Sequence, residues 1–191
     1  MPQKFDDDEF REKFSRIVNQ EVHRIQGIVQ DLLVFSKPAE PKPQRMDVNE
    51  VLKQIGELLS SEILKQRIEV EWLLEEADVM ADRDQIKQAL LNIIMNAMDA
   101  TKPNGGKLVL KTNRREDGLV CISIADTGKG IPANQLPHIF DPFFSSKDGG
   151  TGLGLAITHS IIEKNKGKIF VQSEIGKGTT FTVQIPGVNA G

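Results

Sequence analysis

Asn92 and Asn96 lie four residues apart, a spacing that places both amides on one face of a helix. Apolar residues between Leu90 and Met95 surround them, so we expect the amides at the rim of a pocket. A neutral amide oxygen fills one position around Mg²⁺ while triphosphate oxygens and water complete the shell. The plainer alternative is two polar residues on a solvated helix face.

The segment DTGKGIP at residues 126–132 directly follows an apolar stretch, residues 120–125. A carboxylate at a strand end, here Asp126, accepts a hydrogen bond from an adenine amino group, and Gly128 and Gly130 let the backbone approach a flat base. A plain turn would need no ligand. Asp-Thr-Gly is also the signature of aspartic proteases, but those enzymes need a shared-proton carboxylate pair in an all-β half, and the long helical segments here count against that class.

Three phenylalanines and a glycine-rich stretch lie between Ile139 and Leu155. Because the glycines open a helical pattern, we expect backbone N–H groups and the positive end of the helix dipole to face phosphate. The Walker pattern fails because no Gly-Lys-Ser/Thr follows, and the dinucleotide pattern fails because its third glycine is absent. The phenylalanines are either core residues or part of a hinged lid over a nucleotide.

The composition limits the classes of partner. The 191 residues include 24 basic and 27 acidic side chains, a formal net charge of -3, which argues against nucleic-acid binding and against a polybasic membrane surface. No apolar run reaches the roughly 20 residues of a membrane helix, and the acidic start is unlike a signal peptide. We therefore expect a cytoplasmic chain without a membrane segment. The single cysteine, Cys121, is interpreted as a buried strand residue.

The elements that must position these residues follow from periodicity. Apolar residues at three- and four-residue spacing predict one long amphipathic helix in residues 1–36, and prolines in residues 37–44 predict an extended linker. Residues 45–191 alternate between helical and strand patterns, which predicts an α/β fold, a two-layer sandwich with helices on one face of a mostly antiparallel sheet. The predicted helices are 48–60, 82–100 with a cap at Asp82 or Asp84, and 152–166; the predicted strands are 68–74, 107–113, 118–125, 169–173 and 180–185.

Taken in order, the motifs resemble those of the sensor histidine kinases. The series is Asn-x-x-x-Asn-Ala, Asp-x-Gly-x-Gly-Ile, a Phe-rich segment, Gly-Thr-Gly-Leu-Gly-Leu and Gly-x-Gly-Thr-Thr-Phe, over about residues 45–186. Residues 10–43 and the Phe-Phe-Ser-Ser-Lys segment are similar to the nitrogen-regulatory subgroup, in which the long helix is the second of two dimerisation helices. The resemblance implies the Bergerat ATP-binding fold, shared with gyrase, MutL and the heat-shock chaperone ATPases.

The resemblance also implies ATP and Mg²⁺ as ligands. It implies that Asn96 is the Mg²⁺ ligand, that Asn92 is a phosphate-side partner and that these two asparagines are the catalytic pair. It further implies that Asp126 reads the adenine and that Thr179 is a water-linked helper at the base. The implied nucleotide-binding residues are Asn92, Asn96, Asp99, Asp126, Gly128, Gly130, Ile131, Phe140, Lys147, Thr151, Gly152, Leu153, Gly154, Leu155 and Thr179.

Two positions depart from related subclasses. Hydrolysing relatives and anti-sigma serine kinases have a glutamate, which can act as a general base, where this sequence has Asn92. An amide does not accept a proton at neutral pH, whereas a neutral imidazole already has a nucleophilic nitrogen, so transfer to histidine is favoured. Some relatives have a basic residue where this sequence has Asp99, which leaves charge neutralisation to Mg²⁺ and to Lys147 or Lys129.

None of His23, His138 and His159 lies in the family's acceptor motif, a histidine followed by an acidic residue and, a few places on, a proline. We therefore expect the catalytic part of a two-component sensor histidine kinase, which transfers the γ-phosphoryl of ATP to a histidine outside this sequence for relay to a response regulator. We also expect a homodimer through residues 1–36. The alternatives are an ATP-hydrolysing or serine-phosphorylating relative, and a dimerisation or docking module without catalysis.

Overall fold

The computed structural model describes residues 8–36, 39–102, 104–146 and 150–188. The chain divides into two compact units, Met1–Pro38 and Ala39–Gly191. In the first unit, the helix α1 covers Asp8–Ser36, which lies within the predicted helical residues 1–36. Within the ranges described, no helix combines the length and the apolar character needed to cross a membrane.

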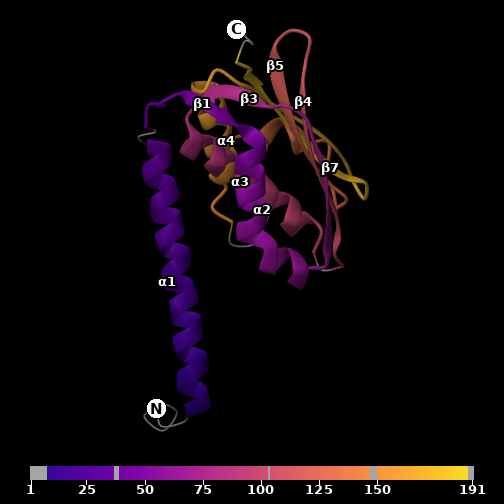
Figure 1. The fold of residues 1–191 in the computed structure, drawn as a ribbon. Helices are drawn as coiled ribbons and strands as arrows, with labels where there is room; N and C mark the ends of the chain where they lie inside the picture. Colours follow the sequence, from indigo (N-terminus) through magenta and orange to yellow (C-terminus); the bar gives the residue numbers. More distant parts are fainter. Residues whose placement is uncertain (1–7, 37–38, 103, 147–149, 189–191) are drawn as a thin grey trace. The chain divides into compact units, whose positions relative to one another are not determined.

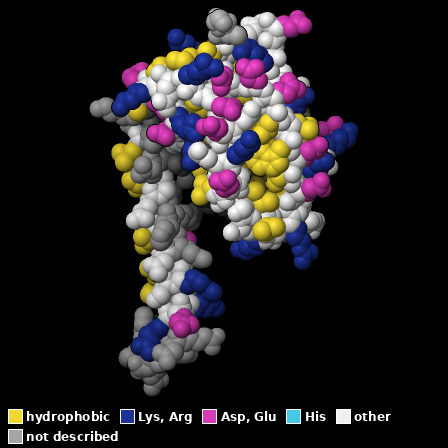
Figure 2. Space-filling model, viewed as in Figure 1, with side chains coloured by type: hydrophobic (Ala, Val, Ile, Leu, Met, Phe, Trp, Pro, Cys, Tyr) yellow, Lys and Arg dark blue, Asp and Glu magenta, His cyan; other side chains and the backbone are white. Residues whose placement is uncertain are grey.

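The helix α1 carries an exposed apolar stripe. Figure 2 shows hydrophobic side chains along it. A helix of this kind owes most of its stability to burial of its apolar face, so the stripe is suited to a packing partner. The stripe residues, each at least 41% exposed, are Phe14, Ile17, Val18, Val22, Ile25, Val29, Leu32 and Leu33.

The second unit consists of a helical layer and a five-stranded sheet (Figure 1). Its elements in chain order are β1 (Gln44–Asp47), α2 (Val48–Lys65), β2 (Ile68–Leu74), β3 (Asp78–Ala81), α3 (Arg83–Ala100), β4 (Gly106–Arg114), β5 (Leu119–Asp126), the short 3₁₀ helix η1 (Leu136–His138), α4 (Gly154–Lys164), β6 (Lys168–Glu174) and β7 (Gly178–Pro186). The strand order in the sheet is β2-β4-β5-β7-β6, in which β2 and β4 are parallel and the other pairs are antiparallel.

Alternation along the strands gives the sheet one buried and one exposed face. Leu110, Ile124 and Phe181 lie side by side in register, and each is at most 4% exposed. The next register row contains Lys111 and Ser123, which therefore lie on the opposite face. Because α2, α3 and α4 all contact the sheet, the core lies between one helical layer and one sheet, as the sequence predicts.

The helix α2 packs on the edge strand β2. Its cap is Asp47, whose carboxylate accepts a hydrogen bond from the Asn49 N–H. Gly56 allows close approach to the strand, since a Cβ there would lie 2.7 Å from Cη2 of the Trp72 indole. On the face that Figure 2 presents, hydrophobic side chains gather where Figure 1 draws α2 and the neighbouring strands. The buried residues of α2 are Val48, Val51, Leu52 and Ile55.

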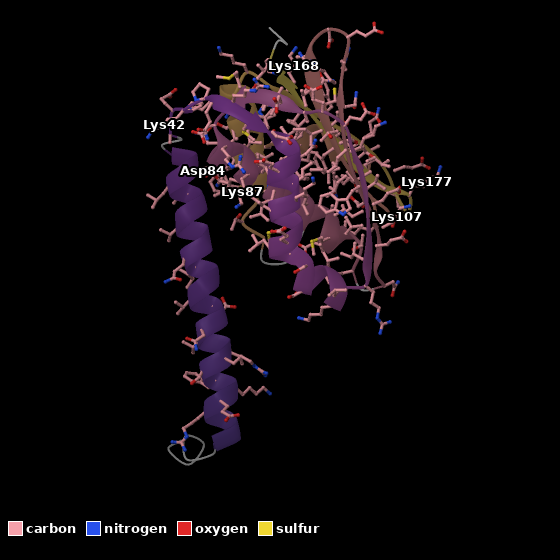
Figure 3. The ribbon with its side chains drawn as sticks, in the orientation of Figure 1. Lys42, Asp84, Lys87, Lys107, Lys168 and Lys177 are labelled. Carbon is pink, nitrogen blue, oxygen red and sulfur yellow. The ribbon has the colours of Figure 1, made fainter. Side chains whose placement is uncertain are left out.

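A polar network joins residues 39–43 to the helical layer. Asp82 caps α3 by accepting from the Asp84 and Gln85 N–H groups, and its second oxygen accepts from the Lys42 N–H at 2.8 Å. The Asp82 N–H donates to the side-chain oxygen of Asn165, which follows α4, at 2.8 Å. Figure 3 shows Lys42 near the start of α3, where Asp84 is labelled. Residues 39–44 of the predicted linker therefore belong to the second unit.

Apart from element ends that shift by one or two residues, two features differ from the sequence-based prediction. The strands β1 and β3 pair as a separate small sheet, which the prediction lacks, because four residues are too few to produce a visible alternation. The helix predicted to end at residue 60 continues to Lys65, where Gln66 forms the C-cap. The apolar residues after Ser60 therefore extend the helix and are not part of a loop.

Candidate functional site

The start of α4 touches α3 at Asn92. The Asn92 Nδ2 donates to the Thr158 hydroxyl oxygen at 2.8 Å, and that hydroxyl donates to the Gly154 carbonyl oxygen at 2.9 Å. A Cβ on Gly154 would lie 2.7 Å from Asn92 Oδ1, so only glycine fits there without displacement. The structure thus brings the first predicted asparagine together with the glycine-rich start of α4.

The loop after β5 touches the other end of the same helix. A Cβ on Gly128 would lie 2.5 Å from the Ala100 carbonyl oxygen, and the Lys129 N–H donates to that oxygen at 3.1 Å. Residues 92, 96 and 100 are one helical turn apart and share a face of α3, with Asn96 midway. At 1.5 Å per residue, the two contact points are about 12 Å apart, enough for an extended ligand.

Backbone and side-chain contacts join the loop to β4 and to the β6–β7 hairpin. Thr127 exchanges two hydrogen bonds with Lys107 on β4, at 2.9 and 3.1 Å. The Lys129 carbonyl accepts from the Gly176 N–H in the β6–β7 turn at 2.9 Å. Gly130 has a φ of +71°, and a Cβ there would collide with the Glu174 carbonyl. These contacts hold the loop between β4 and the β6–β7 hairpin.

Asp126 is a buried carboxylate at the end of β5. It is 7% exposed, and its Oδ1 accepts from the Gly128 N–H at 2.7 Å. Burial raises the pKa of Asp126, and the N–H groups of Gly128 and Thr179, which lower it, only partly offset that effect. The result is a carboxylate that takes up a proton more readily than an exposed aspartate does.

Thr179 lies opposite Asp126 in the β5–β7 register. Its hydroxyl oxygen is 2.9 Å from that of Ser173, which also accepts from the Ile131 N–H at 2.8 Å. Ser173 donates to the Gly178 carbonyl at 2.9 Å. The loop after β5 and the β6–β7 hairpin are therefore joined through one serine.

The start of α4 has the features of an anion site. Leu153, 2% exposed, anchors the helix in the core, and as a leucine N-cap it offers no side-chain oxygen to the first N–H groups. The Thr151 hydroxyl accepts from the Leu153 N–H at 3.2 Å. Gly152 has a φ of +67°, and its Cα lies against the Phe143 backbone. The N–H groups that follow, from Gly154 and Leu155 onward, are those a phosphate would bind.

The Phe-rich segment packs on α4. The ring centroids of Phe140 and His159 are 5.2 Å apart, and Phe140 is half-buried. Phe143 is 66% exposed with a φ of 67°. The predicted nucleotide-binding Lys147 lies outside the described residues. Asp99 forms an ion pair with Lys102 at 2.7 Å, at the same end of α3 as Ala100.

Oxygen donors on α3 suit a hard cation such as Mg²⁺. Asn92 and Asn96 supply neutral amide oxygens one turn apart, beside a helix start suited to phosphate. In the part of the chain that the structure describes, no group of three or more His, Cys, Asp or Glu side chains is arranged to hold a metal ion. Two amide oxygens are a donor set that fits Mg²⁺ when phosphate oxygens and water would fill the remaining positions.

Thr158 and Ser173 contact the predicted site residues but were not predicted. Thr158 lies one turn after Gly154, and Ser173 pairs with Thr179 across the β6–β7 hairpin. The only sequence signal for Thr158 is a hydroxyl in an otherwise apolar helix face, and the signal for Ser173 is a polar cross-strand pair. Neither signal points to a binding site until the fold shows which residues lie beside Thr158 and Ser173.

Comparison with known proteins agrees with this arrangement. Residues 81–189, more than half of the chain, match the family described as "Histidine kinase-, DNA gyrase B-, and HSP90-like ATPase". The chain belongs to this ATPase family. Sensor histidine kinase ZraS of Klebsiella oxytoca is 39% identical over 174 residues, which cover 89% of this chain and 37% of that protein. Sequence similarity within the ATPase family is thus to sensor histidine kinases, as the motifs predict.

Two solved structures confirm the fold. The full-length ShkA structure in complex with AMPPNP has a TM-score of 0.81 and 28% identity, covering 94% of this ATPase-family chain and 39% of that chain. The structure of histidine kinase ThkA in complex with response regulator protein TrrA has a TM-score of 0.80 and 31% identity. The match covers 95% of this chain and 53% of the ThkA chain. The predicted two-layer α/β fold is confirmed, and the chain spans less than two thirds of the length of these proteins.

Proposed function

We propose that this chain binds Mg·ATP and transfers the γ-phosphoryl group to a histidine, from which it passes to a response regulator. The observation that carries the proposal is the arrangement along α3. One end of this helix touches the start of α4 at Asn92, the other touches the loop of Asp126 at Ala100, and Asn96 lies between them. ShkA, which has the same fold, was crystallised with AMPPNP, and ThkA with a response regulator.

Each part of the arrangement has a separate task in this proposal. Asp126 accepts a hydrogen bond from the adenine amino group, with Thr179 beside it. The N–H groups at the start of α4 bind phosphate oxygens. Asn92 and Asn96 orient the Mg²⁺-bound triphosphate, and the ion neutralises charge on the phosphates. Phosphoryl transfer depends chiefly on such positioning and electrostatic stabilisation.

The acceptor histidine in this proposal is none of the three in the sequence. The His138 Nδ1 is 2.8 Å from the Asp141 carboxylate, and the His159 Nδ1 is 3.3 Å from the Glu163 carboxylate. Both therefore serve local contacts in or beside the Phe-rich segment. The His23 side chain lies outside the described residues. Because Asn92 is not a general base, histidine is the acceptor whose nucleophile needs no activation.

The test is incubation of the chain with γ-labelled ATP, alone and with a separate protein that carries the family's acceptor motif. Alone, the chain should remain unlabelled, and the added protein should gain an acid-labile phosphoryl group. Steady release of inorganic phosphate, or a label on serine, would instead favour the hydrolysing or serine-phosphorylating class. Undetectable nucleotide binding would favour a docking module.

We also propose that two copies pair through residues 1–36, that residues 37–44 form the linker and that residues 45–191 form the catalytic domain. The exposed apolar stripe of α1 supports the pairing, because a second copy of the same stripe would cover it. ATP as the phosphoryl donor supports a cytoplasmic location for the catalytic domain.

A further inference from the structure

The buried hydroxyl of Thr158 takes part in two hydrogen bonds whose directions are fixed by proton counting. Thr158 is 1% exposed and lies on the inner side of α4. Its oxygen is 2.9 Å from the Gly154 carbonyl oxygen and 2.8 Å from the Asn92 amide. The carbonyl has no proton to give, so the single hydroxyl proton of Thr158 is committed to it.

This commitment fixes the orientation of the Asn92 amide. With its proton used, the Thr158 oxygen can only accept, so the amide must present its NH₂ group there. The Asn92 carbonyl oxygen then points away from Thr158 toward the start of α4. The position of Gly154 agrees, because a Cβ on that glycine would lie 2.7 Å from Asn92 Oδ1 and 3.1 Å from Nδ2.

An amide held in this way acts as an acceptor at the site. A phosphate oxygen is also an acceptor, so it gains nothing from direct contact with the Asn92 oxygen. A cation, or a water molecule bound to one, gains a ligand. Had Thr158 been valine, this hydrogen bond would be absent, and the amide could rotate and offer its NH₂ group to phosphate.

We propose that Thr158 is a positioning residue, which binds the NH₂ half of the Asn92 amide and thereby turns the carbonyl oxygen toward Mg²⁺ or its bound water. This inference rests on the proposed function, since it requires Mg·ATP as the ligand. It assigns to α4 a second task besides binding phosphate. The helix that receives the triphosphate also sets the orientation of an α3 side chain.

The test compares Thr158→Val, which keeps the shape and removes the hydroxyl, with Thr158→Ser, which keeps the hydroxyl. Affinity of the full chain for a non-hydrolysable ATP analogue is measured by calorimetry with Mg²⁺ and with a chelator. The valine variant should lose roughly tenfold in affinity with Mg²⁺, the equivalent of one hydrogen bond, and change less than twofold without it. The serine variant should stay within about threefold of the parent in both conditions.

Three results would overturn the inference. Equal affinity of parent and valine variant with Mg²⁺ removes the role, and so does an equal loss with and without Mg²⁺, which would indicate a structural effect alone. A parent chain that binds the analogue in neither condition would defeat the proposed function and this inference with it. The first two results leave the proposed function standing. Failure of the Thr158 role can therefore be distinguished from failure of the proposed function.

A second measurement needs no variant to fold. In the nucleotide-free parent, the side-chain NH₂ group of Asn92 is hydrogen-bonded to the buried Thr158 oxygen, whereas Asn134 is exposed. The NH₂ protons of Asn92 should therefore exchange with solvent at least tenfold more slowly than those of Asn134. Resolved NMR signals for the two amides give the comparison directly. Equal exchange rates would show that Thr158 does not hold the Asn92 amide.

Discussion

Asp126, the adenine-binding carboxylate of the proposed function, is a buried group that costs the fold stability. Its folded-state pKa lies above the unfolded value because burial disfavours the charged form. At neutral pH the ionised carboxylate therefore costs stability, and this cost is relieved as pH falls through the folded-state pKa. The ionised form is the one that accepts strongly from an adenine amino group. The proposed adenine contact and the stability of the fold thus make opposite demands on this residue.

The substitution Asp126→Asn should separate the two demands. The asparagine can still accept from the Gly128 N–H but loses the charge, so unfolding temperature should stay equal or rise while nucleotide affinity falls by roughly one to two decades. Calorimetry with an ATP analogue and a thermal unfolding scan measure the two effects. The matched control is Asp117→Asn in the exposed β4–β5 turn, which should leave affinity unchanged.

The pH dependence gives an independent check. Parent affinity should decline on acidification at a higher pH than an exposed aspartate would produce, and the asparagine variant should lack that component. A parent profile that coincides with that of the variant would remove Asp126 from adenine recognition.

The element that carries each motif residue could be predicted from the sequence. Asn92, Asp126 and Gly130 were selected from type and spacing, and the structure places each on the element expected. Thr158 and Ser173 could not be selected, because their contacts arise when α4 meets α3 and when β6 meets β7. Sequence spacing describes one element at a time. Thr158 is 66 residues from its partner Asn92, and Ser173 is 42 residues from its partner Ile131.

Among the elements, the start of α3 depends on one aspartate. Burial raises the pKa of Asp82, but the N–H groups of Lys42, Gln85 and Asp84 outweigh that effect and hold the pKa below its ordinary value. The ionised carboxylate therefore contributes stability above the unfolded-state pKa, and this contribution is lost as pH falls through the folded-state pKa. The residue joins the linker to the helix that carries both asparagines.

Asp82→Ala should lower the free energy of unfolding by about 1–2 kcal/mol, the cost of a lost helix cap. Urea unfolding of the full chain at neutral pH measures the change. Asp84→Ala, an exposed position in the first turn of the same helix, is the control and should cost less than about 1 kcal/mol, since it removes only a favourable dipole interaction. Equal effects of the two substitutions would contradict the cap.

Gly128→Ala tests the contact between the β5 loop and α3. The new Cβ would lie 2.5 Å from the Ala100 backbone, so the loop must move, with an expected cost of about 1–3 kcal/mol and a loss of nucleotide affinity. Gly118→Ala in the β4–β5 hairpin is the control. Its φ of +83° would strain an alanine, but an added Cβ there would meet no atom within 4 Å. It should lower stability and spare affinity. Normal affinity in both variants would show that the loop position does not matter for binding.

Most of the elements follow from periodicity because each has one buried and one exposed face. The strand over residues 68–74 has the predicted bounds, and the helix capped by Asp82 ends at Ala100 as expected. The parallel pairing of β2 with β4 and the pairing of β1 with β3 join residues that are far apart in the sequence. They depend on which strands neighbour each other in space, and local spacing does not contain that information.

At the scale of the whole molecule, the two units bury their residues differently. The second has a core between two layers, whereas α1 has an apolar stripe that its own unit does not cover. A pair of such stripes would form a coiled-coil or bundle interface between copies. Nucleotide binding needs only residues of the second unit in the proposed arrangement.

Ile25→Glu should therefore shift the chain toward a monomer without altering nucleotide affinity. The new charge would lie in the centre of the stripe, where Ile25 is 56% exposed. Sedimentation velocity over a concentration series measures the dimer fraction. Arg16→Glu is the control, because Arg16 lies on the opposite side of the helix at 3.6 residues per turn. A parent chain that sediments as a monomer at every concentration would refute the pairing.

The contact of Trp72 with Gly56 has a practical consequence for spectroscopy. The sequence contains one tryptophan and no tyrosine, so near-ultraviolet fluorescence comes almost wholly from this indole. Its emission reports whether α2 is docked on the edge strand. A red shift that precedes the loss of helical circular dichroism during denaturation would mark the peeling of that helix as a separate event, observable without any attached dye.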